Sequence, residues 1–225
     1  MPGRSLIILN PNSSDIVTAA IDRAVAPLRA AGVPLRCVTS QDGPKAIENQ
    51  RDGDLSIGPM LALAARLEPE ALGFVIACYS DPGLHALRDQ TRLPVTGIQR
   101  ASVAMAMSIA DRFGVIAILD SSVRRQRRSF AAMGVTSMWC GSRALGLGVA
   151  DLADPNKTAA RLIEVGCRLR DEDGAEVLIL GCAGMADYRD FVASETGLPV
   201  VEPSQAAVSV MIGQRLSAGA APRPS

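Results

Sequence analysis

An internal repeat is the feature that most constrains the fold of this chain. Segments 72–98 (LGFVIACYSDPGLHALRDQTRLPVTGI) and 175–203 (AEVLILGCAGMADYRDFVASETGLPVVEP) each contain an apolar run, a cysteine, a turn of small residues, a helical pattern, a Leu-Pro pair and a second apolar run. Cys78 and Cys182 occupy the same place in the two segments and are 104 positions apart. Because self-similarity at a fixed spacing indicates repeated structural units, we predict two similar halves of about 105 residues each.

A second, shorter similarity has nearly the same offset. LIILNPNSS at 6–14 resembles VIAILDSS at 115–122, and Ser14 and Ser122 are 108 positions apart. Chance is the alternative, because every α/β protein contains strand–loop–helix units. If the halves pack around a pseudo-twofold axis, the two cysteines face each other.

Short apolar runs alternate with helical patterns along the chain. The predicted strands are 5–9, 34–40, 72–77, 94–98, 114–119, 135–140, 176–181 and 199–201. The first predicted helix is capped by Ser13 or Ser14 and ends at Gly32, with an apolar stripe of Ile16, Val17, Ala20, Ile21, Ala24, Val25 and Leu28. The other predicted helices are 55–66, 82–90, 101–112, 122–133, 157–170, 185–194 and 204–216. Continuously apolar strands between helices predict the α/β class, with parallel sheets covered on both faces.

Composition excludes several classes of function. Hydrophobic residues make up 48% of the chain and charged residues 20%, as in ordinary globular proteins, and the formal net charge is zero. That balance gives no general attraction to nucleic acid or to anionic membranes. No apolar run reaches the roughly 18 residues of a membrane span, and no secretory signal is visible, so we expect a cytoplasmic protein. The five widely spaced cysteines suit reduced, free thiols, and the Pro-rich segment 217–225 predicts a disordered tail.

The two repeated cysteines suit proton transfer on both faces of one carbon. Each directly follows a predicted strand, and ligands of open parallel sheets bind outside the carboxyl ends of the strands. A racemase needs one acid/base group on each face of its substrate and no cofactor. Thiols are suitable because their ordinary pKa, about 8.5, lies within tuning distance of neutral pH.

The neighbours of the cysteines offer that tuning. Cys78 precedes Asp81-Pro82, and a proline at the first helical position predicts a helix N-terminus that favours a thiolate. Cys182 precedes Ala183-Gly184-Met185, whose consecutive backbone N–H groups are candidates to bind a carbonyl oxygen and stabilise an enolate.

Other polar residues divide into candidate substrate contacts and structural positions. The turn from Asn10 to Ser14 and its counterpart at 120–122 are candidates, with ordinary turn and cap chemistry as the alternative. Gly43-Pro44 predicts a turn, and it is also a candidate for the edge of the cleft. We predict structural roles for Cys37, inside a strand, Cys140, before a Gly turn, and Cys167, inside a helix. We also predict an exposed His85, with tuning of Cys78 as the alternative, and a solvated face for Arg124, Arg125, Arg127 and Arg128.

Three motifs resemble one known family. LNPNSS at 9–14, ACYSDPGL around Cys78 and LGCAGMADY around Cys182 are similar to the Asp/Glu/hydantoin racemase superfamily, and most of all to its hydantoin and allantoin racemase branch. The resemblance covers about residues 6–216. It implies two flavodoxin-like lobes with the active site between them and a C-terminal helix that returns to the first lobe. The expected division is 1–98 with 205–216, and 99–204.

The resemblance also implies roles for particular residues. Cys78 and Cys182 would be the two catalytic thiols, Asn10 a substrate-binding residue, and backbone groups near Ser80 would hold the ring. A homo-oligomer with a small-molecule substrate is expected, without cofactor, metal, nucleic acid or membrane. The predicted substrate-binding residues are Asn10, Ser13, Gly43, Pro44, Ser80, Asp81, Asp120, Ser121, Ser122, Ala183, Gly184 and Met185.

The expected function is racemisation of 5-substituted hydantoins or allantoin by two-thiol 1,1-proton transfer. An aspartate or glutamate racemase is the alternative, because Asp120 is able to pair with an ammonium group. Maleate isomerases of the superfamily also carry two cysteines, whereas its arylmalonate-type decarboxylases rely on only one, in the second motif. A non-catalytic small-molecule binding protein is the alternative outside enzymes.

Overall fold

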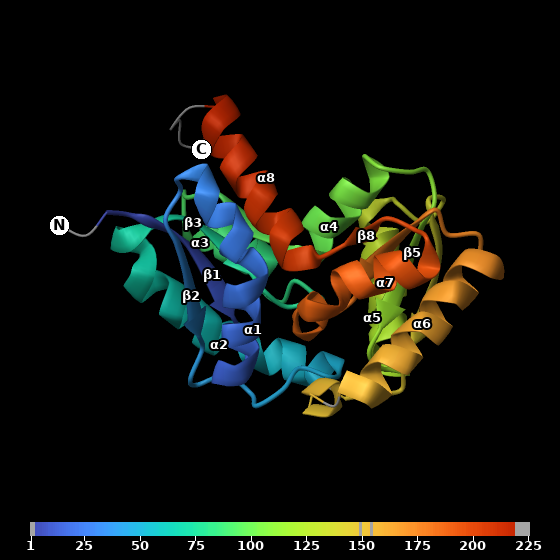
Figure 1. Cartoon of the computed structure of the whole chain (residues 1–225). Helices are drawn as coiled ribbons and strands as arrows, with labels where there is room; N and C mark the ends of the chain where they lie inside the picture. The colour runs from blue at the N-terminus through green and yellow to red at the C-terminus, as the bar shows by residue number, and fades with distance from the viewer. Residues whose placement is uncertain (1–2, 149, 154, 219–225) are drawn as a thin grey trace.

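Two four-stranded parallel sheets form the framework of the chain (Figure 1). The computed structural model describes residues 3–148, 150–153 and 155–218. The first sheet has the order β2-β1-β3-β4, with β1 (Ser5–Asn10), β2 (Leu35–Thr39), β3 (Ala71–Ile76) and β4 (Val95–Gly97). The second has the order β6-β5-β7-β8, with β5 (Phe113–Ala117), β6 (Trp139–Ala144), β7 (Val177–Leu180) and β8 (Val200–Val201). Since the second order repeats the first, the predicted α/β fold of two similar halves is confirmed.

Helices connect the strands and cover the sheets. The α-helices are α1 (Asp15–Val25), α2 (Gln50–Leu67), α3 (Leu84–Gln90), α4 (Ile98–Met107), α5 (Asp120–Met133), α6 (Pro155–Asp171), α7 (Arg189–Thr196) and α8 (Pro203–Ala218). Short 3₁₀ helices are η1 (Ala26–Ala31), η2 (Glu68–Glu70), η3 (Ala150–Ala153) and η4 (Ala183–Tyr188). Side chains cap the first helices of the chain: Ser14 Oγ accepts from the Val17 N–H of α1 at 3.3 Å, and Asn49 Oδ1 accepts from the Asp52 N–H of α2 at 3.0 Å.

Alternate strand residues enter different buried clusters. Ile8 of β1 and Val115 of β5 belong to one cluster that runs between the two sheets. Ile7 of β1 packs in a second cluster, against α2, and Ile116 of β5 packs in a third, against α6. All four of these side chains are fully buried. Burial on both faces explains why the strands are continuously apolar.

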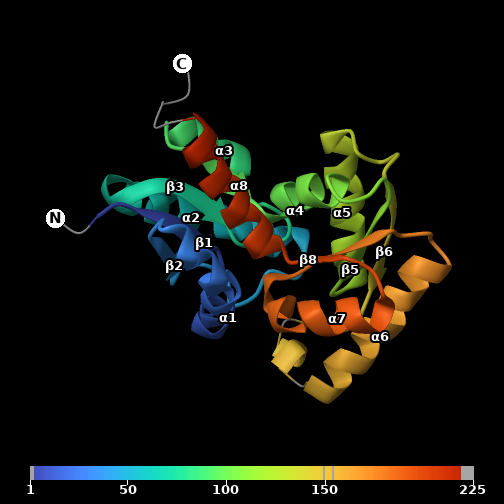
Figure 2. The same cartoon turned by 45° about the horizontal axis from the view of Figure 1, so that its top comes forward.

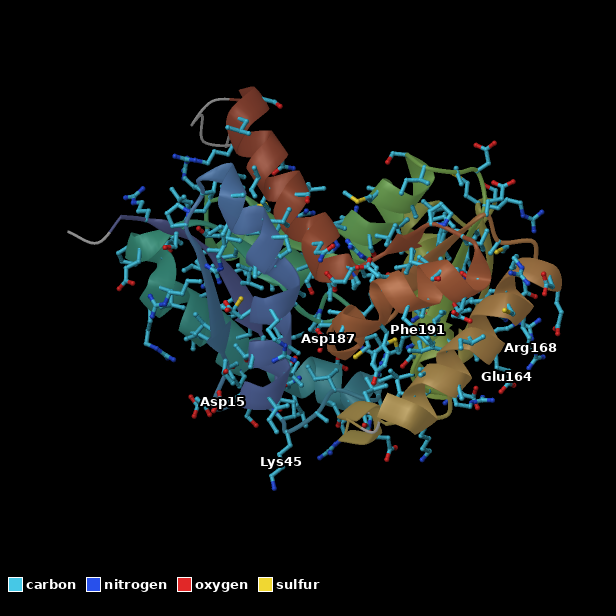
Figure 3. All side chains as sticks on the ribbon, in the orientation of Figure 1. Asp15, Lys45, Glu164, Arg168, Asp187 and Phe191 are labelled. Atoms are coloured by element: carbon cyan, nitrogen blue, oxygen red, sulfur yellow. The ribbon has the colours of Figure 1, made fainter. Side chains whose placement is uncertain are left out.

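The helix that ends each half crosses to the other half. α4 follows β4 of the first sheet but contacts β5, β7 and β8 of the second, and α8 follows β8 but contacts β3, β4 and α1. Figures 1 and 2 show α8 beside the first sheet, with α4 between the sheets. On these contacts we propose the division 1–98 with 205–216, and 99–204. Figure 3 shows Glu164 and Arg168 projecting outward from α6, the charged outer face of the second half.

Several predicted boundaries were wrong for local reasons. Residues 135–138 are not the start of a strand: the Val135 N–H donates to Phe130 O at 3.1 Å and closes the end of α5, so β6 begins at Trp139. Cys140 therefore lies inside β6, not before a Gly turn. Ile16 is not part of the buried stripe of α1, because 82% of it is exposed. Residues 217 and 218 of the predicted tail belong to α8, and the rest of that tail lies outside the described residues.

Candidate active site

One cavity of about 40 Å³ brings the two repeated cysteines together. Cys78 follows β3 and Cys182 follows β7, so the carboxyl ends of the central strands of both sheets meet at this cavity. Both are free thiols and both are partly buried. The cavity is lined by Asn12, Val17, Ile47, Ala77, Cys78, Tyr79, Ser80, Ile118, Ser122, Arg125, Gly181, Cys182 and Ala183.

Burial dominates the electrostatics of Cys78. Desolvation raises the pKa of its thiol, and the hydrogen bond with Ser80 and the positive charge of Arg125 oppose that rise. The Cys78 Sγ and Ser80 Oγ atoms are 3.5 Å apart. The expected helix N-terminus does not reach this thiol, because α3 begins at Leu84, after a left-handed Gly83, and not at Pro82. The prediction of a helix-stabilised thiolate was therefore wrong.

Cys182 has a more acidic neighbourhood. Burial raises the pKa of its thiol to about 12, and the negative charges of Glu202 and Glu48 add to the rise. The Gly184 N–H opposes the rise, because it donates to Cys182 Sγ at 3.4 Å. One of the predicted backbone N–H groups thus points to the sulfur atom itself. The two thiols differ, since Arg125 lowers the pKa of Cys78, whereas the charges that act on Cys182 raise its pKa.

Asp81 holds the loop of Cys78 against the start of α4. Its Oδ1 accepts from the Gln99 N–H and its Oδ2 from the Arg100 N–H, both at 2.9 Å. Gly97 makes room for this carboxylate, since a Cβ built there would lie 2.1 Å from Asp81 Cγ. Burial raises the pKa of Asp81 to about 6. The carboxylate that we predicted to bind substrate is thus engaged with backbone in this structure.

The first turn presents a different asparagine from the predicted one. Asn10 is fully buried; its Nδ2 donates to Asn12 Oδ1 at 2.9 Å and to Thr18 Oγ1 at 3.0 Å, and its Oδ1 accepts from the Asn12 N–H at 3.2 Å. Asn12 lines the cavity, whereas Asn10 is not among the lining residues. Asn10 therefore shapes the turn that carries Asn12. Sequence alone does not tell which of two asparagines in one turn lines the cavity and which one folds the turn.

The predicted Gly43-Pro44 turn packs against the same loop. The Ser13 N–H donates to Pro44 O at 2.9 Å, and a Cβ on Gly43 would lie 2.3 Å from Pro11 O. Only a glycine permits this close approach of two backbones. Gly43, Pro44 and Ser13 are thus positioned beside the cavity without lining it.

The remaining predicted residues divide between the cavity wall and its support. Ser80, Ser122 and Ala183 line the cavity. Asp120 begins α5, and Ser121 Oγ donates to Glu48 O at 2.6 Å, which ties the second half to the first. Met185 is fully buried in the core of the second half.

Arg125 is the main residue that sequence reasoning missed. Its neighbours Arg124, Arg127 and Arg128 are exposed as predicted, and so is His85, but Arg125 lines the cavity. Its Nη2 donates to Ser122 Oγ at 3.2 Å, and its Nε and Nη1 are buried without a hydrogen-bond partner among the described residues. Helical spacing could have identified Arg125 from the sequence, because it lies three residues after the candidate Ser122 and therefore on the same face of α5.

Neither a cluster of metal ligands nor a helix able to cross a bilayer occurs in the described part of the chain. Within it, no three His, Cys, Asp or Glu residues are grouped as a metal ion would require. Within the same residues, every helix is too short or too polar to cross a bilayer.

Comparisons with known proteins place these features in a family context. Residues 6–211 match the family described as Asp/Glu/Hydantoin racemase. The chain is 36% identical to a hydantoin racemase of Rhizobium meliloti over 205 residues, which are 90% of this chain and 85% of that protein. It is 34% identical to a hydantoin racemase of Pseudomonas sp. (strain NS671) over 197 residues, 87% of this chain and 79% of that protein. The structure of allantoin racemase from Klebsiella pneumoniae is similar, with a TM-score of 0.85, 30% identity and coverage of 98% of this chain and 91% of that one.

Proposed function

This chain belongs to the Asp/Glu/hydantoin racemase family and is an isomerase of the racemase type, and we propose that it racemises 5-substituted hydantoins or allantoin with two thiols. The observation that carries the proposal is the single cavity lined by both Cys78 and Cys182. Two acid/base groups beside one carbon are what 1,1-proton transfer needs.

The reaction follows from the position of the thiols. The thiolate of one cysteine removes the proton from C5 of the ring and becomes a thiol. The electron pair left on C5 is delocalised onto the adjacent carbonyl as an enolate. The opposite thiol then gives its proton to the other face of C5 and becomes a thiolate. The product is the mirror-image ring, and the two cysteines have exchanged protonation states without help from a cofactor.

The wall of the cavity favours a ring over a free amino acid. None of the described residues that line it is a carboxylate, and Asn12, Ser80 and Ser122 offer neutral hydrogen-bonding groups. An amino-acid zwitterion brings an ammonium group, which is costly to bury without a negative partner. Asp120, the residue that would favour aspartate or glutamate, is not among the lining residues.

The test is a substrate panel followed by variants of single thiols. Initial rates of loss of optical rotation, corrected for enzyme-free blanks, are measured for L-5-substituted hydantoins, allantoin, aspartate and glutamate, and isomerisation of maleate, which is achiral, is followed by ultraviolet absorbance. We expect turnover of hydantoins or allantoin, and loss of roughly a hundredfold or more in Cys78→Ser and in Cys182→Ser. Cys37→Ser, in β2 and away from the cavity, is the matched control and keeps the wild-type rate.

Deuterium exchange separates racemisation from binding. In deuterated water a racemase places solvent deuterium at C5, whereas a binding protein leaves the C–H bond intact. If either serine variant keeps near wild-type racemisation, the two-thiol mechanism is wrong. Turnover of aspartate, glutamate or maleate in place of hydantoins would overturn the proposed substrate class.

A further inference from the structure

A second, larger cavity adjoins the thiol cavity. Its volume is about 340 Å³, and it shares Ser80 and Arg125 with the wall of the thiol cavity. The rest of its wall comes from α2, from the loop after Cys78, from Gln99 of α4 and from α5. The two cavities therefore meet where the thiol loop of the first half faces α5 of the second.

The sizes of the two cavities imply a division of the substrate between them. A volume of about 40 Å³ holds only a few water-sized groups, since one such group occupies roughly 10–15 Å³. It takes the reacting edge of a ring and little more. A group attached to C5 therefore needs a neighbouring space, and the larger cavity adjoins the position of the thiols.

The chemistry of the larger cavity is polar, and most of its polar groups already have partners. The Asp81 carboxylate accepts from two backbone N–H groups, and Asp54 Oδ1 accepts from Gln50 Nε2 at 2.8 Å. Arg128 Nη2 donates to Gln50 Oε1 at 3.0 Å.

Arg125 differs from these residues, because its Nε and Nη1 are buried with no acceptor among the described residues. A buried guanidinium with unused N–H groups is costly, and an oxygen acceptor on a ligand removes that cost. The wall of the larger cavity therefore favours a ligand group that accepts hydrogen bonds over an apolar group.

We propose that the larger cavity receives the substituent on C5, and that it selects substituents ending in a carbonyl or carboxylate oxygen, which Arg125 binds. This inference rests on the proposed hydantoin racemase function and adds the specificity of its site. Arg125 contacts the substrate in this arrangement and is a specificity-determining residue.

Three hydantoins of nearly equal size test the chemistry. They carry isobutyl, carbamoylmethyl or carboxymethyl at C5, so only the polar atoms differ. The kcat/KM of each is divided by its rate of uncatalysed C5 exchange, because the substituents change the acidity of the C–H bond. We expect the two oxygen-bearing substrates to exceed the isobutyl one by roughly tenfold or more. An isobutyl substrate that is turned over equally well or better overturns the inference.

Variants of α5 then test whether Arg125 binds the substituent. Arg125→Met is expected to remove most of the preference, that is, to lower the ratio of carboxymethyl to isobutyl turnover. Arg127→Met, an exposed arginine of the same helix, is the matched control and keeps the wild-type ratio. If Arg125→Met slows all three substrates equally, the residue acts on the thiol or the fold alone, and its proposed contact with the substituent is wrong.

Two glycines of α2 test whether the C5 substituent lies in the larger cavity. Gly53 lines the larger cavity, and a Cβ there meets only Ile47 Cγ2 at 3.9 Å, so Gly53→Met fits the helix and fills the cavity. Gly58 is in the same helix, is exposed and has nothing within 4 Å of an added Cβ, so Gly58→Met is the matched control. We expect Gly53→Met to lower the ratio of 5-carboxymethyl to 5-methyl turnover by roughly tenfold, and Gly58→Met to leave it unchanged. An unchanged ratio in Gly53→Met shows that the substituent lies elsewhere.

The same panel of substrates tests the proposed preference for oxygen-bearing substituents separately from the proposed racemase function. Turnover of 5-methylhydantoin without an oxygen preference overturns this inference and leaves the racemase function standing. Absence of turnover both with every hydantoin of the panel and with allantoin overturns both.

Discussion

Arg125 of α5 and the Cys78 thiol interact electrostatically, although one belongs to the second half of the chain and the other to the first. Both line the thiol cavity. The interaction opposes the burial that raises the pKa of Cys78. The ability of this thiol to ionise therefore depends on how the two halves are packed together.

Removing the charge of Arg125 is expected to shift the pH dependence of catalysis. A thiolate without its neighbouring cation forms at a higher pH, so the acid limb of the kcat/KM profile of Arg125→Met moves upward by roughly one unit. The profile is measured between pH 6 and about 10 with 5-methylhydantoin. Arg127→Met serves as the control and keeps the wild-type limb. An unshifted limb in Arg125→Met would mean that Arg125 does not affect the ionising group.

The two thiols are expected to react with alkylating reagents in a fixed order. Burial raises the pKa of both thiols. For Cys78, Ser80 and Arg125 oppose the rise and Asp81 adds to it, whereas for Cys182 the Gly184 N–H opposes the rise and Cys78, Glu202 and Glu48 add to it. Iodoacetamide at pH 8 should therefore modify Cys78 first, by roughly tenfold in rate, because the thiolate is the reactive form. Peptide mass spectrometry over time measures both rates. Equal rates, or faster modification of Cys182, would show that Cys78 does not ionise more readily than Cys182.

The repeat in the sequence predicted the large-scale arrangement because it reflects topology. Cys78 and Cys182 hold equal places in the repeat, and the two sheets have equal strand orders, so the carboxyl ends of β3 and β7 meet. Continuously apolar strands also indicated burial on both faces. These features depend on periodicity and spacing, which a single sequence displays directly.

The finer geometry of the site depends on contacts between distant segments, which spacing does not reveal. Asn10 resembled a substrate contact, but its amide is used to fold the turn that carries Asn12. Asp81 resembled a helix start, but it accepts from N–H groups of α4. Arg125 belongs to a run of arginines that is typical of a solvated face. Its place in the cavity wall follows from Ser122, which lies one helical turn earlier and lines the same cavity.

Asp81 is expected to make stability depend on pH in mildly acidic solution. Burial raises its pKa from 3.8 to about 6, so the folded state binds a proton more tightly than the unfolded state. Its contribution to the free energy of unfolding is complete below pH 4 and is lost as the pH rises through about 6, by up to about 3 kcal/mol. Urea unfolding at a series of pH values measures the loss.

Asp81→Asn isolates this effect from other groups. Glu202 is also buried with a raised pKa and contributes with the same sign, so the comparison is the difference between wild type and variant. That difference should change between pH 4 and 6 for Asp81→Asn. A constant difference for Asp81→Asn would show that its carboxyl does not titrate in this range.

Gly97→Ala is expected to disturb the thiol loop from a distance. The backbone of Gly97 has an ordinary extended conformation, with φ −113°, so the cost of an alanine is steric and not conformational. Its Cβ would lie 2.1 Å from Asp81 Cγ, which forces the carboxylate away from the N–H groups of Gln99 and Arg100. We expect a loss of about 2–4 kcal/mol in the free energy of unfolding and slower racemisation, since Asp81 lies three residues after Cys78.

A double-mutant cycle identifies the cause of that loss. In an Asp81→Ala background the colliding carboxylate is absent, so Gly97→Ala should cost much less than it does in the wild type. Gly213→Ala in α8, where an added Cβ has nothing within 4 Å, is the control and shows no coupling to Asp81→Ala. Urea unfolding of the single and double variants supplies the four free energies of each cycle. Additive costs for Gly97 and Asp81 would mean that the glycine is needed for some reason other than the space that the Asp81 carboxylate occupies.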